Sequence, residues 1–236
     1  MNEMKSMMKT NSNSYTIIYA AVMVIIVAFL LAFTNQALKS RQNRNIELDT
    51  KKQILASLNI RDVKDANAAY DKYVTKEGDM LLQPDGTLVI NDGPFATNYS
   101  DEYMHHRYHI FVCSVNDQTK YVFPLYGNGL WGAIWGYVAL NDDRNTIYGA
   151  YFSHQSETPG LGAEIASVPF QSEFKDHKVF KDSVVALSVV KNGKVTNREY
   201  EVDGISGGTI TSKGVDAMIK NCLKAYKNFL NQKMYK

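Results

Sequence analysis

The segment over residues 203–212 contains the groups best suited to hold an anion. It reads DGISGGTITS, with three glycines, four hydroxyl residues and one aspartate. Glycines let the backbone turn and expose its N–H groups. A helix predicted to begin near Ser212 would point its free N–H groups and its positive dipole end at the same place, so we expect a phosphate site. Helix capping by Thr211 or Ser212 is the alternative, but it accounts for only one hydroxyl.

A second segment, residues 154–162, reads HQSETPGLG and follows a predicted strand. Its proline stiffens the backbone, and its two glycines allow another group to approach closely. His154 and Glu157 lie three residues apart, so they could form an acid–base pair or a set of structural hydrogen bonds. The structural role is favoured because no serine or cysteine nucleophile in an elbow sequence accompanies them.

The third segment, residues 127–132, reads GNGLWG and joins two predicted strands. An ordinary hairpin loop is the alternative interpretation. Trp131 is a candidate for stacking on a ligand, or it fills the core as most tryptophans do.

Metal and disulfide chemistry are not indicated by the cysteines and histidines. Cys113 and Cys222 are too few for a disulfide framework and lack zinc-site spacing, so we interpret them as small packed side chains. A metal site built on His105, His106 and His109 is the alternative. Adjacent side chains of a strand point to opposite faces, so we interpret this trio as the start of a strand and predict no metal ligand.

Alternating β-branched and aromatic residues predict a series of strands from residue 87 onward. These strands cover residues 87–90, 108–115, 121–126, 131–140, 146–153, 184–190 and 196–202. The turn-like sequence KNGK at residues 191–194 predicts that the last two form a hairpin.

Helical periodicity is strongest near the C-terminus, where apolar residues recur on one face. These are Val215, Met218, Ile219, Cys222, Leu223, Tyr226, Phe229 and Leu230. Residues 36–58 predict a helix that continues out of the N-terminal apolar run, with a new helix start at Asp49 or Thr50. Residues 62–76 predict a short helical or extended stretch. The fold class is therefore α+β, with a largely antiparallel sheet and flanking helices.

Residues 15–33 form an uncharged apolar run, YTIIYAAVMVIIVAFLLAF. As a helix this run is about 28 Å long, close to the ~30 Å thickness of the hydrocarbon layer. A cleavable signal peptide, with Lys5 and Lys9 as its basic region, is the alternative. The run is longer than a usual signal core and no small-x-small site follows it, so we predict a retained single-pass anchor in membrane lipid.

Charge excludes some classes of function but leaves the orientation of the anchor open. The chain has 26 Lys and Arg against 24 Asp and Glu, and 45% of its residues are hydrophobic, so we predict no nucleic-acid partner and no disordered tail. Basic residues stand on both sides of the anchor: Lys5, Lys9, Lys39, Arg41 and Arg44. Taken alone, they would keep the large domain in the cytoplasm, but long domains translocate despite such charges.

The three segments resemble motifs of the FMN-binding subunits of bacterial respiratory complexes. Residues 206–211, SGGTIT, resemble the family motif SGAT-x-T, with Gly208 in place of alanine. Residues 154–162 match H-x-x-ETPGLG, and residues 127–131 match G-x-GLW. The single anchor agrees as well. The chain is most similar to the C-type subunits of the sodium-translocating NADH:quinone reductase, and the GLW sequence separates it from their siblings, the G-type subunits of the Rnf complex.

The resemblance implies a covalent cofactor. In the family, FMN is joined through its phosphate to the last threonine of the motif, which corresponds to Thr211; Thr209 is the alternative acceptor. No catalytic residue and no metal ligand are expected. The residues expected to surround the FMN are Ser206, Gly207, Gly208, Thr209, Ile210, Glu157, Thr158, Gly160, Leu161, Gly162, Gly129, Leu130 and Trp131.

The resemblance also implies an electron carrier that does no chemistry on a substrate of its own. Electrons would arrive from an iron–sulfur centre and leave to the FMN of a second membrane subunit, on the way from NADH to ubiquinone, while the whole complex moves sodium. A separate flavin transferase would attach the FMN. The alternatives are a G-type subunit of an Rnf complex, a stand-alone anchored flavoprotein, and a flavin-free assembly module.

We accordingly expect four regions in the chain. These are a short N-terminal segment (1–13), a transmembrane anchor (14–35), a helical or mixed connecting region (36–105) and an FMN-binding domain (106–236). The family resemblance places the protein in the inner, cytoplasmic membrane with the large domain on the extracytoplasmic side.

Overall fold

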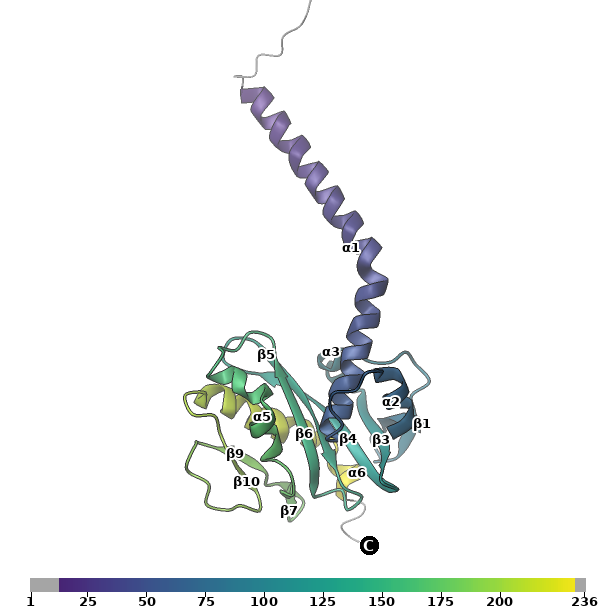
Figure 1. Ribbon diagram of the computed structural model, residues 1–236, viewed down its shortest axis with the longest axis vertical. Coiled ribbons are helices and arrows are strands. Elements are labelled where there is room, and N and C mark those ends of the chain that lie inside the picture. The colour runs from purple at the N-terminus through teal and green to yellow at the C-terminus, as the bar shows by residue number, and fades with distance from the viewer. Residues whose placement is uncertain (1–12, 232–236) are drawn as a thin grey trace, which may run out of the picture. The chain divides into compact units, whose positions relative to one another are not determined.

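The structure is a computed structural model that describes residues 13–231 (Figure 1). It consists of two compact units that divide after Ile46. Lys5, Lys9 and all but the last residue of the expected N-terminal segment 1–13 lie outside the described residues, as do the last five residues of the chain.

The helix α1, Asn13–Ser57, forms the described part of the first unit up to Ile46, and its last residues belong to the second unit. Its apolar part is long and apolar enough to cross a membrane. Large apolar side chains between Ile17 and Phe33 are exposed, which is what a lipid-facing helix requires. The predicted restart at Asp49 or Thr50 is wrong, because α1 is continuous to Ser57.

The second unit is built on a six-stranded antiparallel sheet in the order β2-β1-β3-β4-β5-β6. The strands are β1 Val74–Leu82, β2 Leu88–Ile90, β3 Tyr108–Val115, β4 Gln118–Asn128, β5 Ala133–Leu140 and β6 Ile147–His154. The strands predicted over residues 87–153 are confirmed. Most of β1 was not predicted, because its centre is polar and its register shifts between Val74 and Asp79.

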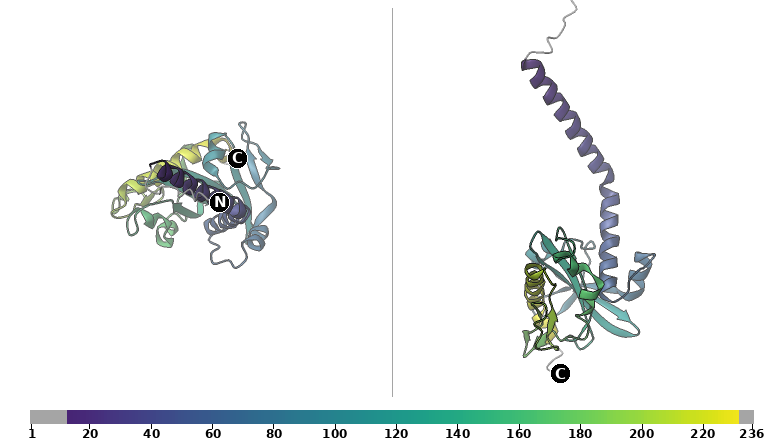
Figure 2. Two further views of the ribbon diagram at one scale, coloured as in Figure 1. Left: turned by 90° about the horizontal axis from the view of Figure 1, so that it is seen from above. Right: turned by 60° about the vertical axis from the view of Figure 1, so that its left-hand side comes forward.

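Both faces of the sheet are covered, and successive residues of one strand belong to different cores. Ile110 of β3 and Phe123 of β4 pack in the core beneath α5, Thr209–Ala225. Their neighbours Phe111 and Val122 pack on the opposite face, in the core that contains Ile54 from the end of α1. Figure 2 shows the yellow-green α5 and the end of α1 on opposite sides of the sheet.

Short helices complete the second unit. They are α2 Ala66–Tyr73, α3 Tyr99–Met104, the 3-10 helix η1 Gly162–Ala166, α4 Val168–Ser172 and α6 Lys227–Asn231. The predicted C-terminal periodicity is confirmed, because its apolar residues are buried in α5 and in the turn and α6 that follow.

The hairpin predicted around residues 191–194 is wrong. β7, Phe180–Lys181, pairs with β8, Val184–Val185, whereas β9, Ser188–Val190, pairs in parallel with β10, Glu201–Asp203. The KNGK turn does form, but a second turn at residues 197–200 reverses the chain again, so β10 runs in the direction of β9.

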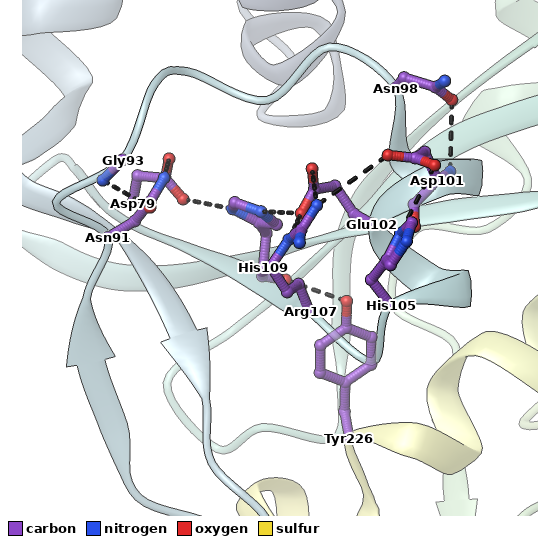
Figure 3. A network of polar contacts seen from close by, with 10 residues as sticks. All are labelled: Asp79, Asn91, Gly93, Asn98, Asp101, Glu102, His105, Arg107, His109 and Tyr226. Carbon is purple, nitrogen blue, oxygen red and sulfur yellow. Dashed lines mark hydrogen bonds and ion pairs between the residues drawn. The ribbon is translucent and has the colours of Figure 1, made fainter.

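The histidine trio does not form the start of one strand. His105 is the C-cap of α3 and His106 has φ +56°, so this pair lies in the turn that ends the helix. Only His109 lies in β3, where it is buried, with Nδ1 2.8 Å from Asp79 Oδ1 and Nε2 3.4 Å from Glu102 Oε2 (Figure 3). Arg107 also pairs with Glu102. Within residues 13–231, no group of three or more His, Cys, Asp or Glu is arranged to hold a metal ion.

Candidate functional site

The three glycine-containing segments meet at the N-terminal end of α5. At three glycines, an atom of another segment lies so close that a side chain would not fit, which shows that the segments are in contact. A Cβ on Gly214, inside α5, would clash with the carbonyl oxygen of Asn128 at the end of β4. A Cβ on Gly162 would clash with the Thr211 hydroxyl, and one on Gly132 would lie 2.6 Å from Ser156 Oγ.

Glu157 joins all three segments through its carboxylate. The Thr211 hydroxyl donates a hydrogen bond of 2.6 Å to Glu157 Oε2, and the backbone N–H of Trp131 donates one of 2.8 Å to Oε1. The side chain is buried, with only 4% of the residue exposed. Cβ atoms on Gly129 or Gly162 would clash with its two oxygens, so both glycines are needed to make room for the carboxylate.

The surroundings of Glu157 keep its carboxylate charged. Burial by itself raises the pKa of this group, but the hydrogen bonds from Thr211 and Trp131 and the nearby His154 hold the pKa below its ordinary value. The backbone N–H of Glu157 donates a 3.2 Å hydrogen bond to His154 Nδ1. The contact observed between this pair is thus a structural one that fixes the loop.

The helix α5 begins at Thr209, three residues before the predicted start. Its N-cap is Gly208, which makes no side-chain cap hydrogen bond, so the alternative interpretation, capping by Thr211 or Ser212, is wrong. The Ser212 hydroxyl donates to the Gly208 carbonyl and accepts from the N–H of Ile205.

This start places three N–H groups at the helix end. Residues 209–211 occupy the first turn of α5, where no helical carbonyl lies one turn earlier to accept their N–H groups. The Gly208 N–H, which we expected to join them, donates to the Ile205 carbonyl at 3.0 Å. The predicted anion site is therefore smaller than expected but keeps the favourable end of the helix dipole.

Four large apolar side chains are exposed on the three segments that meet near Thr211. They are Leu130, Trp131, Leu161 and Ile210. Trp131 is 67% exposed, so the interpretation of this residue as core filling is wrong. Leu161 packs toward Gly207, where an added Cβ would lie 2.7 Å from Leu161 Cδ2. Thr158, Gly160 and Ser206 are exposed in the same segments, while Thr211 itself is only 1% exposed.

Comparison with known proteins identifies the family. Residues 129–224 match the family model described as an FMN-binding domain. The chain is 30% identical over 230 residues to the C-type subunit of the Na(+)-translocating NADH-quinone reductase of Haemophilus ducreyi, and the match covers 89% of both chains. The chain belongs to this family of C-type subunits. The family predicted from the three motifs is thereby confirmed.

Two crystal structures of C-type subunits share the fold. The Parabacteroides distasonis protein has 45% sequence identity and a TM-score of 0.76, with 82% of this chain and 96% of that chain covered. The Shewanella oneidensis NqrC has 23% identity and a TM-score of 0.68, with 82% and 100% covered. The residues that match the FMN-binding domain, 129–224, include most of the three segments that meet at the start of α5.

Some residues that build the site were not predicted from the sequence. Ser156 donates a 3.0 Å hydrogen bond to the Trp131 carbonyl and so ties two of the segments together. Gly214 lets α5 approach β4 closely. A glycine inside a strongly amphipathic helix is a recognisable signal for such an approach. For Ser156 the sequence offers no comparable signal.

Proposed function

We propose that this protein carries FMN attached through its phosphate to Thr211 and passes electrons within a sodium-translocating NADH:quinone reductase. The observation that carries the proposal is the position of the Thr211 hydroxyl. It lies in the first turn of α5 and donates a hydrogen bond to Glu157, and the segments that meet there carry exposed apolar side chains. Thr209, the alternative acceptor, has no such carboxylate partner in the described structure.

The residues present fit a flavin mononucleotide. The N–H groups of residues 209–211 and the positive end of α5 suit its phosphate. Leu130, Trp131, Leu161 and Ile210 offer apolar surface to its ring system.

The weakness of this binding site supports covalent attachment. An exposed helix dipole stabilises an anion by only about 0.3–1 kcal/mol, and the apolar rim is open to solvent. Such a site orients FMN but does not retain it. An ester bond removes the need for an enclosing pocket, so the ring can remain accessible to a neighbouring subunit.

The flavin supplies the redox chemistry, and the protein holds and orients it. The chain itself binds the phosphate at the N-terminal end of α5. Its exposed apolar side chains contact the ring and keep it at the protein surface. The partners are the other subunits of the complex, including a second FMN-carrying membrane subunit that receives the electrons, and the flavin transferase that loads Thr211.

Attachment requires part of the site to move. Thr211 is 1% exposed, and Gly162 lies directly against its hydroxyl. Gly162 and the residues beside it must therefore move away before a phosphate reaches the hydroxyl. The backbone contact between Glu157 and His154, at the start of this loop, stays in place if only the later residues swing away.

The proposal is tested by replacing each threonine in turn. Full-length protein is produced together with a flavin transferase, and flavin fluorescence is measured in a denaturing gel. We expect Thr211→Ala to remove all covalent flavin and Thr209→Ala to retain it, with mass mapping placing FMN on the peptide that contains residue 211. Fluorescence that persists in Thr211→Ala refutes the assignment. Flavin-free wild-type protein favours an assembly module instead.

A further inference from the structure

The contact between Thr211 and Glu157 has the geometry of an activated nucleophile. A hydroxyl is a weak nucleophile unless an adjacent base takes its proton, and the two groups must lie within about 2.6–3.2 Å. Thr211 Oγ1 lies 2.6 Å from Glu157 Oε2. Such arrangements also include a third group that orients the base. Here the Trp131 N–H fixes the other carboxylate oxygen.

Burying the Glu157 carboxylate costs free energy, and the apolar packing around it does not offset that cost. A buried carboxylate is unfavourable unless hydrogen bonds satisfy it. The chain supplies two hydrogen bonds and reserves room with two glycines, Gly129 and Gly162. Glu157 is charged at neutral pH, because its partners lower its pKa. Only the charged form can accept a proton.

We infer that Glu157 orients the Thr211 hydroxyl and accepts its proton when the flavin is attached. This inference rests on the proposed attachment of FMN at Thr211. It assigns to the acceptor protein, rather than to the flavin transferase, the base that activates the hydroxyl.

The step balances with flavin adenine dinucleotide as the donor. FMN alone has no good leaving group on its phosphate, whereas in the dinucleotide that phosphate carries AMP. The Thr211 Oγ–phosphorus bond forms, the bond to the AMP oxygen breaks, and AMP leaves with the electron pair. The hydroxyl proton moves to Glu157 Oε2 and then to solvent. Nothing is oxidised or reduced.

A purely structural role for Glu157 predicts different behaviour. After esterification Thr211 Oγ1 has no proton to donate, so this hydrogen bond belongs to the unmodified protein. If the bond only stabilises the fold, its loss lowers the melting temperature and raises KM through a disordered acceptor. If the carboxylate is the base, its loss lowers kcat while the folded acceptor still binds with the same KM.

The experiment uses full-length unmodified protein in detergent, purified flavin transferase and flavin adenine dinucleotide. Covalent flavin is measured against time at varied acceptor concentration. Glu157→Gln keeps the shape and a hydrogen-bonding side chain but accepts no proton. We expect its kcat to fall about 100-fold or more, with KM within about twofold of wild type. Glu157→Asp restores part of the rate.

Ser156→Ala is the comparison for loop structure, because it removes the contact to the Trp131 carbonyl but keeps the Glu157 carboxylate. Its kcat is expected to fall less than that of Glu157→Gln, because the group that accepts the proton is still present. Each variant is also melted without the transferase. If Glu157→Gln does not fold, the test uses the folded Glu157→Asp variant instead. A kcat for Glu157→Asp equal to that of wild type overturns the inference.

Two results overturn the inference while leaving the proposed function intact. One is a wild-type kcat for Glu157→Gln, which assigns the base to the transferase. The other is an equal loss in Glu157→Gln and Ser156→Ala, which makes the effect one of loop structure. If wild-type protein takes up no covalent flavin, the proposed function itself is refuted.

Discussion

At the scale of single residues, the site depends on how closely the backbone approaches a buried carboxylate. Gly129 and Gly162 both lie against Glu157, and Gly162 also lies against the Thr211 hydroxyl. A side chain at either position would push apart groups that are joined by a 2.6 Å hydrogen bond. These glycines are therefore required for space rather than for a left-handed conformation.

We predict that Gly162→Ala weakens both the fold and the loading of flavin. The added methyl clashes with Thr211 and Glu157, and overpacking of this kind costs about 1–3 kcal/mol. Urea unfolding measures the loss, and gel fluorescence after production with a transferase measures the flavin. Gly160→Ala is the control, because it has φ +74° but no atom within 4 Å of an added Cβ. It should cost about 1–2 kcal/mol for its backbone and leave loading unchanged. Equal loading in both variants would contradict the prediction.

At the scale of elements, charged contacts join the α3 side of the second unit to the sheet (Figure 3). Buried His109 of β3 lies between Asp79 of β1 and Glu102 of α3. The side-chain hydrogen bond from Arg107 is the largest influence on Glu102 and lowers its pKa; burial opposes it, and His109 lowers it further. This network adds charged contacts to the apolar packing of Tyr99 and Tyr103, which also holds the short helix α3 against the second unit.

We predict that this network makes stability fall in acid. The pKa of Glu102 is lower in the folded than in the unfolded chain, so its contribution is complete above the unfolded value of about 4.5 and is lost as pH falls through the lower folded value. Glu102→Gln should cost about 1–3 kcal/mol at neutral pH and flatten the acid decline. Urea unfolding at several pH values measures this.

Glu199→Gln provides the comparison for Glu102→Gln. Its pair with Lys178 is exposed to solvent and should contribute little to the free energy of unfolding. An unchanged acid decline in Glu102→Gln would show that other carboxyl groups control the pH dependence.

At the scale of the whole molecule, an apolar helix and a folded domain belong to one chain. The apolar part of α1 is exposed along its length, whereas the second unit has its own two cores. We propose that the helix anchors the protein in the inner membrane and that the large domain lies on the extracytoplasmic side, as the family resemblance implies.

We predict that a cysteine placed in the domain is labelled from outside the cell. Asn192 is exposed, so Asn192→Cys should react with a membrane-impermeant maleimide in intact spheroplasts. Wild-type protein is the control, because Cys113 and Cys222 are buried and burial raises the pKa of both thiols. Labelling that appears only after lysis would place the domain in the cytoplasm.

The sequence by itself determined the features that depend on local pattern. An uncharged apolar run defines the candidate membrane span, and periods of two and 3.6 residues define β3–β6 and α5. The three motifs identified the family because the loops carry chemistry that a core does not need. Each of these signals lies within a short stretch of chain.

Only the tertiary structure decided which distant groups meet. Thr211 and Glu157 are 54 residues apart, and nothing near either one indicates the other. The polar strand β1 forms because β3 pairs with it, and β10 runs parallel to β9 because a second turn reverses the chain. Trp131, in the loop between β4 and β5, is exposed although most tryptophans are packed in a core. Long-range pairing fixes all of these, and local periodicity has no access to it.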